Sequence, residues 1–242
     1  PSRGLGDVYK RQFKESLSVD NRKRGNLKSL VSGFGIVLKN RRYVYYVLQM
    51  GFAMGVLFAN ISSSPFIVQQ HYGFSAFEFS LFFGINALAI GLAAGLSVKF
   101  KNPEHAMFLG SVGMTMMSAV EFVILSNEYH FAVYEAVLFV LLFSMGLTFT
   151  ASTTLAMDCE RANSGTASAL FGAAGFAFGG IVSPLVGLGD ILSTTGLIFF
   201  VCSVCSLCFS VLAMNQTHTN LWGSFKCKMG PVTRFVFLRR EK

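Results

Sequence analysis

The sequence predicts an all-α integral membrane protein with six transmembrane helices. Of its 242 residues, 52% are hydrophobic and 13% are charged, whereas a soluble globular domain carries about 25% charged residues. The charged residues are also clustered, which leaves long apolar stretches between them. Because an α-helix needs about 20 mostly apolar residues to cross the hydrocarbon core, we expect one span in each stretch. The stretches lie near 43–67, 79–98, 106–126, 132–157, 165–189 and 193–214.

The distribution of basic residues predicts the orientation of these spans. All 20 Lys and Arg residues fall in the first 42 residues, in the loops 99–105 and 158–164, or in the tail after 214. The alternate loops contain none: 68–78, 127–131 and 190–192. Since cytoplasmic loops carry an excess of Lys and Arg, both termini are expected in the cytoplasm. The formal net charge of +8 follows from this asymmetry and gives little support for nucleic-acid binding.

The two ends of the chain differ from the six-span region at 43–214. Residues 1–12, PSRGLGDVYKRQ, look like a translated library-adapter sequence and are set aside from fold reasoning. Residues 13–42 predict a basic cytoplasmic loop. Within it, apolar residues from Leu27 to Leu38 have helical spacing, which favours a helix on the inner leaflet; a partly disordered linker is the alternative. Residues 215–242 are expected to form a basic cytoplasmic tail.

The expected spans also repeat weakly. FGINALAIG at 83–91 and FGAAGFAFG at 171–179 share Phe, Gly, Ala and Gly at matching positions. GVLFANISSS at 55–64 and GLTFTASTTL at 146–155 share Gly, Phe and a hydroxyl pair. The second span therefore resembles the fifth, and the first resembles the fourth. Three spans plus three of opposite orientation form the inverted repeat of many secondary transporters.

Four stretches carry a resemblance to a known family. They are ESL at 15–17, NRRYVYYVL at 40–48, FANISSSPFIVQQHYGFSAFEFSLFFGINAL at 58–88 and SGTASALFGAAGFAFGGIVSPLVG at 164–187. Together they resemble the Bcr/CflA-type drug:proton antiporters of the major facilitator superfamily. The most specific parts are Ser-Pro-Phe followed by Tyr-Gly-Phe-Ser and Phe-Ser-Leu, and the Gly-Thr-Ala-Ser-Ala-Leu segment. The loop GLSVKFKNP at 95–103 is a degenerate version of the superfamily's inter-span motif and adds little.

The resemblance covers residues 13 to about 214 and implies the C-terminal half of a major facilitator fold, spans seven to twelve of twelve. It implies that the N-terminal half of the same transporter, with the main proton-coupling acid, is missing. The implied function is export of small hydrophobic or amphipathic compounds (multidrug efflux) from a bacterial cell across the inner membrane. Export would occur by proton antiport through alternating access, with no cofactor. A metabolite carrier of the same superfamily and a channel-like protein are the alternatives, although the spans show no charged ring or carbonyl filter.

In superfamily members the first and fourth spans of each half line the substrate cavity. Polar side chains in hydrocarbon need a partner or a wet cavity, and Asn60 is the strongest candidate of this kind. A hydrogen bond between helices is its alternative role. Phenylalanines on these spans are expected to line an apolar pocket. The resemblance thus implies the cavity residues Gln49, Phe52, Asn60, Ser63, Ser64, Phe143, Thr148 and Phe149.

Two acids lie within the expected spans, where ionisable residues are functional by default. Glu121 lies about five residues from the outer end of the third span, and Glu135 about three from the outer end of the fourth. At about 1.5 Å per residue both lie within about 8 Å of the boundary, where carboxylates reach headgroups or water. Glu121 is the proton-coupling candidate and Glu135 a weaker one. Pro65 and Pro184 are expected hinges because proline removes a backbone donor.

Small residues recur every four positions on two spans, along one side of each helix. Small side chains let transmembrane helices approach closely. In the family these two helices face the missing half, so the resemblance implies a packing surface between halves; packing within this half is the alternative. The fifth span carries Gly175, Gly179, Ser183 and Gly187, and the second carries Ala87, Gly91 and Gly95.

Neither an enzyme nor a metal site is predicted. No nucleophile–base pair or phosphate-binding loop is visible within a span. The four histidines fall in loops or in the tail: His71, His105, His130 and His218. The motif CSVCSLC at 202–208 has metal-like spacing, but its neighbours offer no polar support for a bound metal. In such a span Cys behaves as a small apolar residue.

Overall fold

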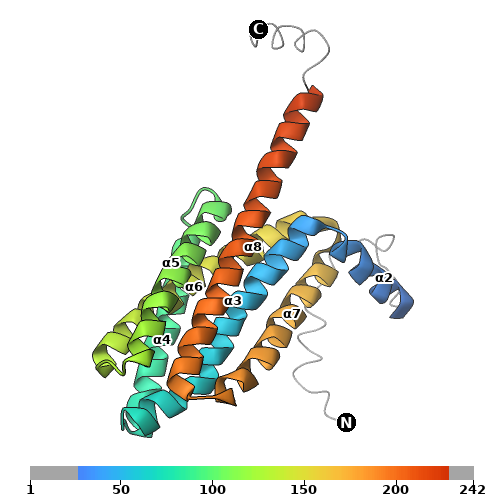
Figure 1. Ribbon diagram of the computed structural model, residues 1–242. Helices are drawn as coiled ribbons and strands as arrows, with labels where there is room; N and C mark the ends of the chain where they lie inside the picture. The colour runs from blue at the N-terminus through green and yellow to red at the C-terminus, as the bar shows by residue number, and fades with distance from the viewer. Residues whose placement is uncertain (1–26, 229–242) are drawn as a thin grey trace, which may run out of the picture.

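All regular secondary structure is helical in the computed structural model of the chain, which describes the backbone of residues 27–228 and the side chains of 32–216 (Figure 1). Six of the described helices are long and apolar enough to cross a membrane. This confirms the predicted fold class. Their α-helical parts are α3 (Arg41–Pro65), α4 (Ala76–Ser97), α5 (Pro103–Ser126), α6 (Phe131–Cys159), α7 (Ser164–Leu185) and α8 (Ile191–Lys228).

Capping residues in the polar loops define where several of the spans begin. α4 begins with a capping box: the hydroxyl of Ser75 accepts from the backbone N–H of Glu78, and the Glu78 carboxylate accepts from the N–H of Ser75. α3 begins after Asn40, whose side chain accepts from the N–H of Tyr43. α5 has Pro103 in its first turn, where a missing N–H costs no hydrogen bond. The helix starts are therefore encoded locally.

Four helices form the centre of the bundle. α3, α6, α5 and α8 pack in a closed ring, while α4 lies outside against α6 and α7 lies outside against α3 (Figure 1). Exchanging the first three spans with the last three reproduces this arrangement, because α3 then takes the place of α6, α4 of α7 and α5 of α8. The predicted repeat of three plus three spans is therefore present in the packing.

The two outer helices are the least covered parts of the bundle. On α4, Leu88 is 65% and Leu92 is 63% exposed; on α7, Phe176 is 71% and Ile181 is 67% exposed. Apolar surface of this extent needs an apolar surrounding. Lipid or further transmembrane helices therefore cover these faces.

Both predicted hinge prolines lie where the winding of a helix changes. α3 ends at Pro65 and continues as a π-helical stretch, η2 (Phe66–His71). α7 ends one residue after Pro184 and continues as a 3-10 turn, η4 (Val186–Leu188). A hinge motion at these prolines stays a prediction.

The ends of the chain differ in part from the expected division. α8 continues to Lys228, past the expected end of the last span at 214, so part of the predicted tail is helical. The helix expected in the N-terminal loop is present as α2 (Leu27–Leu38) and contacts α3 and α7. Its position on a membrane leaflet stays a prediction. The adapter-like residues 1–12 lie outside the described residues.

Candidate functional site

One buried polar group connects α3, α6 and α8. The side-chain amide of Gln49 donates to the hydroxyl of Ser206 (Nε2 to Oγ, 3.0 Å), and its oxygen accepts from the hydroxyl of Ser152. Ser206 donates in turn to the backbone carbonyl of Gln49 (3.1 Å). All three residues are fully buried. Gln49 therefore joins helices, as polar side chains in apolar surroundings commonly do, and does not face an open cavity.

Asn60 also lies inside the bundle. It is 2% exposed, and its Oδ1 atom accepts a hydrogen bond from the hydroxyl of Ser64 (2.9 Å). Its backbone carbonyl accepts from Ser63 (3.5 Å). Thr148 is fully buried against α5, where its hydroxyl donates to the backbone carbonyl of Met107 (3.4 Å). Each of these four polar residues is thus an interior residue of the six-helix unit. A role for them in the substrate cavity stays a prediction.

The predicted pocket phenylalanines have different environments. The ring of Phe52 lies 4.8 Å from that of Phe178 on α7 and 5.8 Å from that of Phe209 on α8, measured between centroids. Phe52 thus packs three helices together. Phe143 and Phe149 of α6 are both half-buried. Phe149 packs beside an apolar cluster shared by α3 and α6, so it is the better placed of the two for a surface between these helices.

The predicted coupling acids lie in a polar cluster formed by α4, α5 and α6, in which Glu121 is buried and Glu135 is half-buried. Glu121 is 0% exposed, and neither carboxylate oxygen has a hydrogen-bond partner among the described residues. Oε1 of Glu135 accepts from the side-chain amide of Asn86 (2.9 Å). The hydroxyl of Tyr134, also fully buried, lies beside Ser64. We refer to Glu121, Glu135, Asn86 and Tyr134 as the acid cluster.

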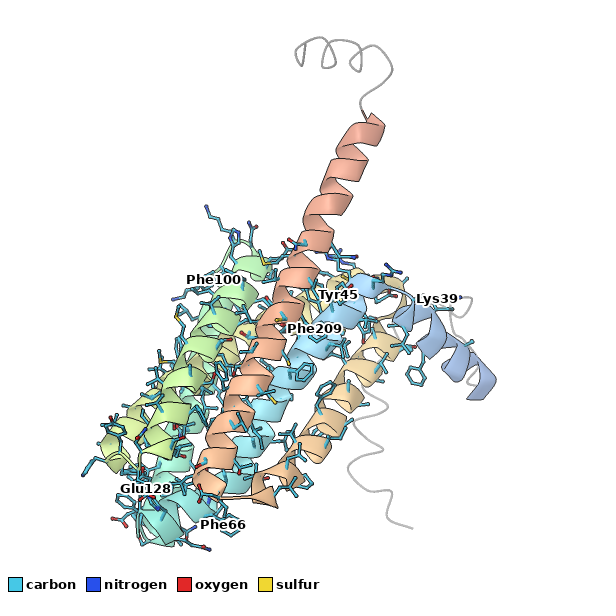
Figure 2. All side chains as sticks on the ribbon, viewed as in Figure 1. Lys39, Tyr45, Phe66, Phe100, Glu128 and Phe209 are labelled. Atoms are coloured by element: carbon cyan, nitrogen blue, oxygen red, sulfur yellow. The ribbon has the colours of Figure 1, made fainter. Side chains whose placement is uncertain are left out.

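The acid cluster lies near the end of the bundle at which Glu128 is labelled in Figure 2. The sequence predicts that acids at this depth reach headgroups or water. Glu121 instead faces into the bundle, because it follows Met114 and Ser118 on the buried side of α5 at a spacing of about one turn. Depth in the membrane therefore does not determine whether this carboxyl group is exposed. The side of the helix on which it lies does.

Sequence reasoning missed Asn86. It is the single amide side chain of α4, and it lies within FGINALAIG, the segment that revealed the repeat. An amide at the centre of an apolar span was the available signal, because such a group needs a polar partner. Its partner, Glu135, is separated from it by an entire span in the sequence.

A second group of polar contacts, also not predicted, lies at the opposite end of the bundle, marked by Lys39 in Figure 2. The guanidinium of Arg42 donates to the carboxylate of Glu104 (2.8 Å), which joins α3 to α5. The side-chain amide of Asn40 donates to the carboxylate of Glu160 (2.8 Å), which joins the start of α3 to the end of α6. These pairs hold three helix ends together, and both are partly buried.

The cysteines of the last span take part in helix packing. A Cβ atom added to Gly55 of α3 would lie 3.2 Å from the sulfur of Cys202, which is buried. No three His, Cys, Asp or Glu side chains within the described part of the chain gather as a metal ion would require. The other two cysteines of the motif are less covered, since Cys205 is half-buried and Cys208 is exposed.

The small residues of α7 seat this helix on α3. A Cβ atom on Gly179 would overlap the ring of Phe58, and one on Gly175 would lie 3.1 Å from the terminal carbon of Met50. The hydroxyl of Ser183 donates to the backbone carbonyl of Phe58 (3.4 Å). These contacts support the alternative, packing within this half, and a role of the three small residues between two halves stays a prediction. They allow close approach of helices within this half.

The small residues of α4 are open. Ala87, Gly91 and Gly95 are exposed, and a Cβ atom on either glycine would meet no atom within 4 Å. Gly187, beyond the end of α7, is open in the same way. The role of these positions between two halves stays a prediction.

Known proteins resemble this chain in sequence. Residues 10–184 match the Major Facilitator Superfamily. Over 214 residues the chain is 33% identical to a protein of Bacillus subtilis (strain 168) described as the uncharacterized MFS-type transporter YdgK, and the match covers 86% of this chain and 53% of that protein. The chain thus spans about half the length of the curated relative that it matches. With its six spans arranged as half of the corresponding fold, the chain belongs to the major facilitator superfamily.

Proposed function

We propose that this chain supplies one half of a secondary transporter that exports small hydrophobic or amphipathic compounds in exchange for protons. In such a carrier two halves rock about a site between them, so that the site opens to one side of the membrane at a time. The family match supports a membrane carrier. The similarity of the 58–88 and 164–187 segments to drug:proton antiporters supports the substrate class and the coupling ion.

The observation that carries the proton coupling is the burial of Glu121. An ionisable side chain within a membrane bundle is costly and marks the paths of protons, ions or substrates. Glu121 is fully buried, and both carboxylate oxygens lack partners among the described residues. An apolar side chain of similar volume would serve packing at least as well. Binding and release of a proton is the function that needs a carboxyl group here.

The proposed substrate surface is apolar. Because Gln49, Asn60 and Thr148 are buried inside the bundle, the less buried side chains of α3 and α6 are available to a substrate. Met54 and Phe149 are partly buried beside the same apolar cluster, and Ile61 is 41% exposed. A wall of this kind suits hydrophobic compounds. Among the less buried hydroxyls of α6, those of Thr153 and Thr154 donate to backbone carbonyls of their own helix. They therefore offer little selectivity for a sugar or an organic acid, which favours drug-like compounds over such metabolites.

Transport in proteoliposomes tests the proposed function. The full-length transporter that contains this chain is reconstituted with an imposed pH gradient, and uptake of a permanently charged, fluorescent lipophilic cation is followed. Proton antiport predicts accumulation in vesicles with an acidic lumen, abolished by a protonophore and absent from vesicles without protein. Saturable flux that ignores the pH gradient would indicate a different carrier, and a current that follows an ion gradient would indicate a channel. Either result contradicts the proposal.

We further propose that the protein lies in a bacterial inner membrane with both termini in the cytoplasm, because all basic residues fall on one side. In a background without native cysteines, Ser75→Cys and Asn127→Cys should react with an impermeant thiol reagent added to intact cells. Both positions are exposed. Lys101→Cys, exposed in a loop of the opposite side, is the matched control and should react only after the membrane is opened. The reverse pattern of labelling would reverse the orientation.

A further inference from the structure

We propose that the acid cluster is a proton-binding site in which the carboxyl groups of Glu121 and Glu135 share one proton, with Asn86 and Tyr134 as neutral partners. The site lies inside one six-helix unit, near the outer end of α5 and α6. It rests on the proposed function in one respect, which is that proton binding drives transport. The binding itself does not depend on which compound is carried.

The cluster contains an excess of hydrogen-bond acceptors. Four buried acceptors have no partner among the described residues, namely both oxygens of Glu121, Oε2 of Glu135 and Oδ1 of Asn86, whereas the cluster has one donor without a partner, the hydroxyl of Tyr134. The amide group of Asn86 is a donor, and it already serves Oε1 of Glu135 at 2.9 Å. Buried acceptors without donors are costly. A proton on one carboxyl oxygen supplies the missing donor.

The charges of the cluster also require a proton. Glu121 and Glu135 lie near the same end of the packed helices α5 and α6. Within the described residues, no Lys, Arg or His side chain compensates either acid. Like charges repel several-fold more strongly in an apolar interior than in water, and each buried charge is itself costly. One proton shared by the pair removes one of the two negative charges. The remaining charge is on Glu135, to which the amide of Asn86 donates.

Few other titratable groups face the pair from the surrounding helices. Tyr134 of α6 interacts with both acids, and Tyr72, which follows η2, interacts with Glu121 and with the exposed Glu128 of the outer loop. α4 contributes Asn86, which does not ionise. The part of α8 whose side chains are described, up to Gln216, contributes no titratable group that acts on Glu121. The response of the site to pH near neutrality should therefore come from the carboxyl pair.

The site connects the two repeats of the fold. Asn86 and Glu121 lie in the first three spans, whereas Tyr134 and Glu135 lie in the second three. When the pair releases its proton to water, one O–H bond is broken and one carboxylate is formed. The two carboxylates then repel across α5 and α6, while Asn86 keeps its hydrogen bond to the charged Glu135 and holds α4 to α6. Proton exchange thus changes the contact of α5 with α6 and leaves the contact of α4 with α6 in place.

Infrared titration of the purified full-length transporter tests the site. The carbonyl-stretching band of protonated carboxylic acids is followed against pH in the unaltered protein and in Glu121→Gln and Glu135→Gln, since Gln keeps the shape and cannot release a proton. The unaltered protein is expected to lose the band of the cluster in two steps, because interacting acids titrate as a pair. Each single variant should show one step, and the double variant none. Glu128→Gln, an exposed acid at the same end, is the matched control and should leave both steps in place.

A further variant keeps both acids. Asn86→Leu removes the neutral partner of Glu135, so the step that Glu121→Gln leaves behind should shift in pH when the two substitutions are combined. Because the combined variant keeps Glu135, this measurement is possible even if Glu135→Gln does not fold. An unshifted step in the combined variant would overturn the assignment of that step to Glu135.

Transport by the same variants separates this site from the proposed drug export. Uptake driven by the pH gradient is expected to be lost in Glu121→Gln and Glu135→Gln and retained in Glu128→Gln. A two-step titration in a protein that transports no lipophilic cation would support the proton-binding site and contradict the proposed drug export. A band unchanged in both single variants, or one that responds to Na⁺ and not to pH, would overturn the shared proton whatever compound is carried.

Discussion

α4 and α7 are equivalent helices of the two repeats, yet their small residues have opposite environments. On α7, Gly175 and Gly179 are buried against side chains of α3. On α4, Gly91 and Gly95 are exposed and have no neighbouring atom within 4 Å of an added Cβ. The same spacing of four residues therefore lies at a helix contact on α7 and on an exposed side of α4. Spacing identifies a side of a helix but does not identify what that side contacts.

The difference follows from the register of the repeat. The shared letters of FGINALAIG and FGAAGFAFG align Gly91 with Gly179. The contacts instead make Ile90, the residue before Gly91, the counterpart of Gly179. One residue of an α-helix corresponds to a rotation of about 100°. A shift of one residue therefore moves the stripe of α4 from the packed side of the helix to the open side.

Two close approaches of helices support this register. Gly146 of α6 meets Ile90 and Ala93 of α4, and Gly55 of α3 meets Val182 of α7. Gly55 and Gly146 are already paired by the repeat in the first and fourth spans. Ala93 and Val182 are then equivalent positions, in the same register as Ile90 and Gly179. The contacts thus correct the alignment that the sequence suggests for the outer helices.

The largest effect on folding is expected for Gly146→Leu, at the contact of α4 with α6. An added Cβ atom would lie 2.6 Å from the carbonyl oxygen of Ile90 and 3.0 Å from its Cα. Backbone cannot rotate away as a side chain can, so α4 must move. Overpacking costs about 1–3 kcal/mol and occasionally more, and we expect the upper end of that range. Thermal unfolding of the purified protein measures the loss of stability. An unchanged unfolding temperature would contradict the close contact of α4 with α6 at Gly146.

A smaller loss of stability is expected for Gly179→Leu, at the contact of α7 with α3. The obstacle is the ring of Phe58, which can turn aside, so the lower part of the range of about 1–3 kcal/mol applies. The sequence alone predicts that this change separates the two halves and abolishes transport with insertion intact. Packing within one half predicts that stability falls as well.

The neighbouring glycine provides the control for this experiment. Gly180 is exposed, and a Cβ atom there would meet nothing within 4 Å, so Gly180→Leu should unfold at nearly the temperature of the unaltered protein. Phe58→Ala combined with Gly179→Leu should recover part of the lost stability, because it vacates the space that leucine needs. Equal unfolding temperatures for Gly179→Leu and Gly180→Leu would mean that the buried stripe is placed on the wrong side of α7.

The smallest effect on folding is expected for Gly91→Leu. The position is open, and surface substitutions of this kind usually change the free energy of unfolding by less than about 0.5 kcal/mol. If α4 faces the second half of the transporter, transport by the full-length protein should nevertheless fall, because the added side chain holds the halves apart. Normal transport together with normal stability would assign this side of α4 to lipid.

Composition and charge alone determined the six spans and the helical class of this protein. The length needed to cross a bilayer is a property of the membrane, so each span can be recognised without knowledge of its neighbours. The caps of the helices are also local, as the pairing of Ser75 with Glu78 illustrates. The repeat was visible because equivalent spans kept a few common residues, although not in the register that the contacts adopt.

The direction of each side chain within a span was decided by the tertiary structure. Gln49 and Asn60 are polar residues of the type expected in a substrate cavity, yet their side chains form hydrogen bonds inside the bundle. In a soluble helix an apolar stripe marks the buried side, but in lipid the outer side is apolar as well, so periodicity no longer distinguishes the two. Only packing against α3 and α6 shows that Gly179 and Glu121 face inward while Gly91 faces out.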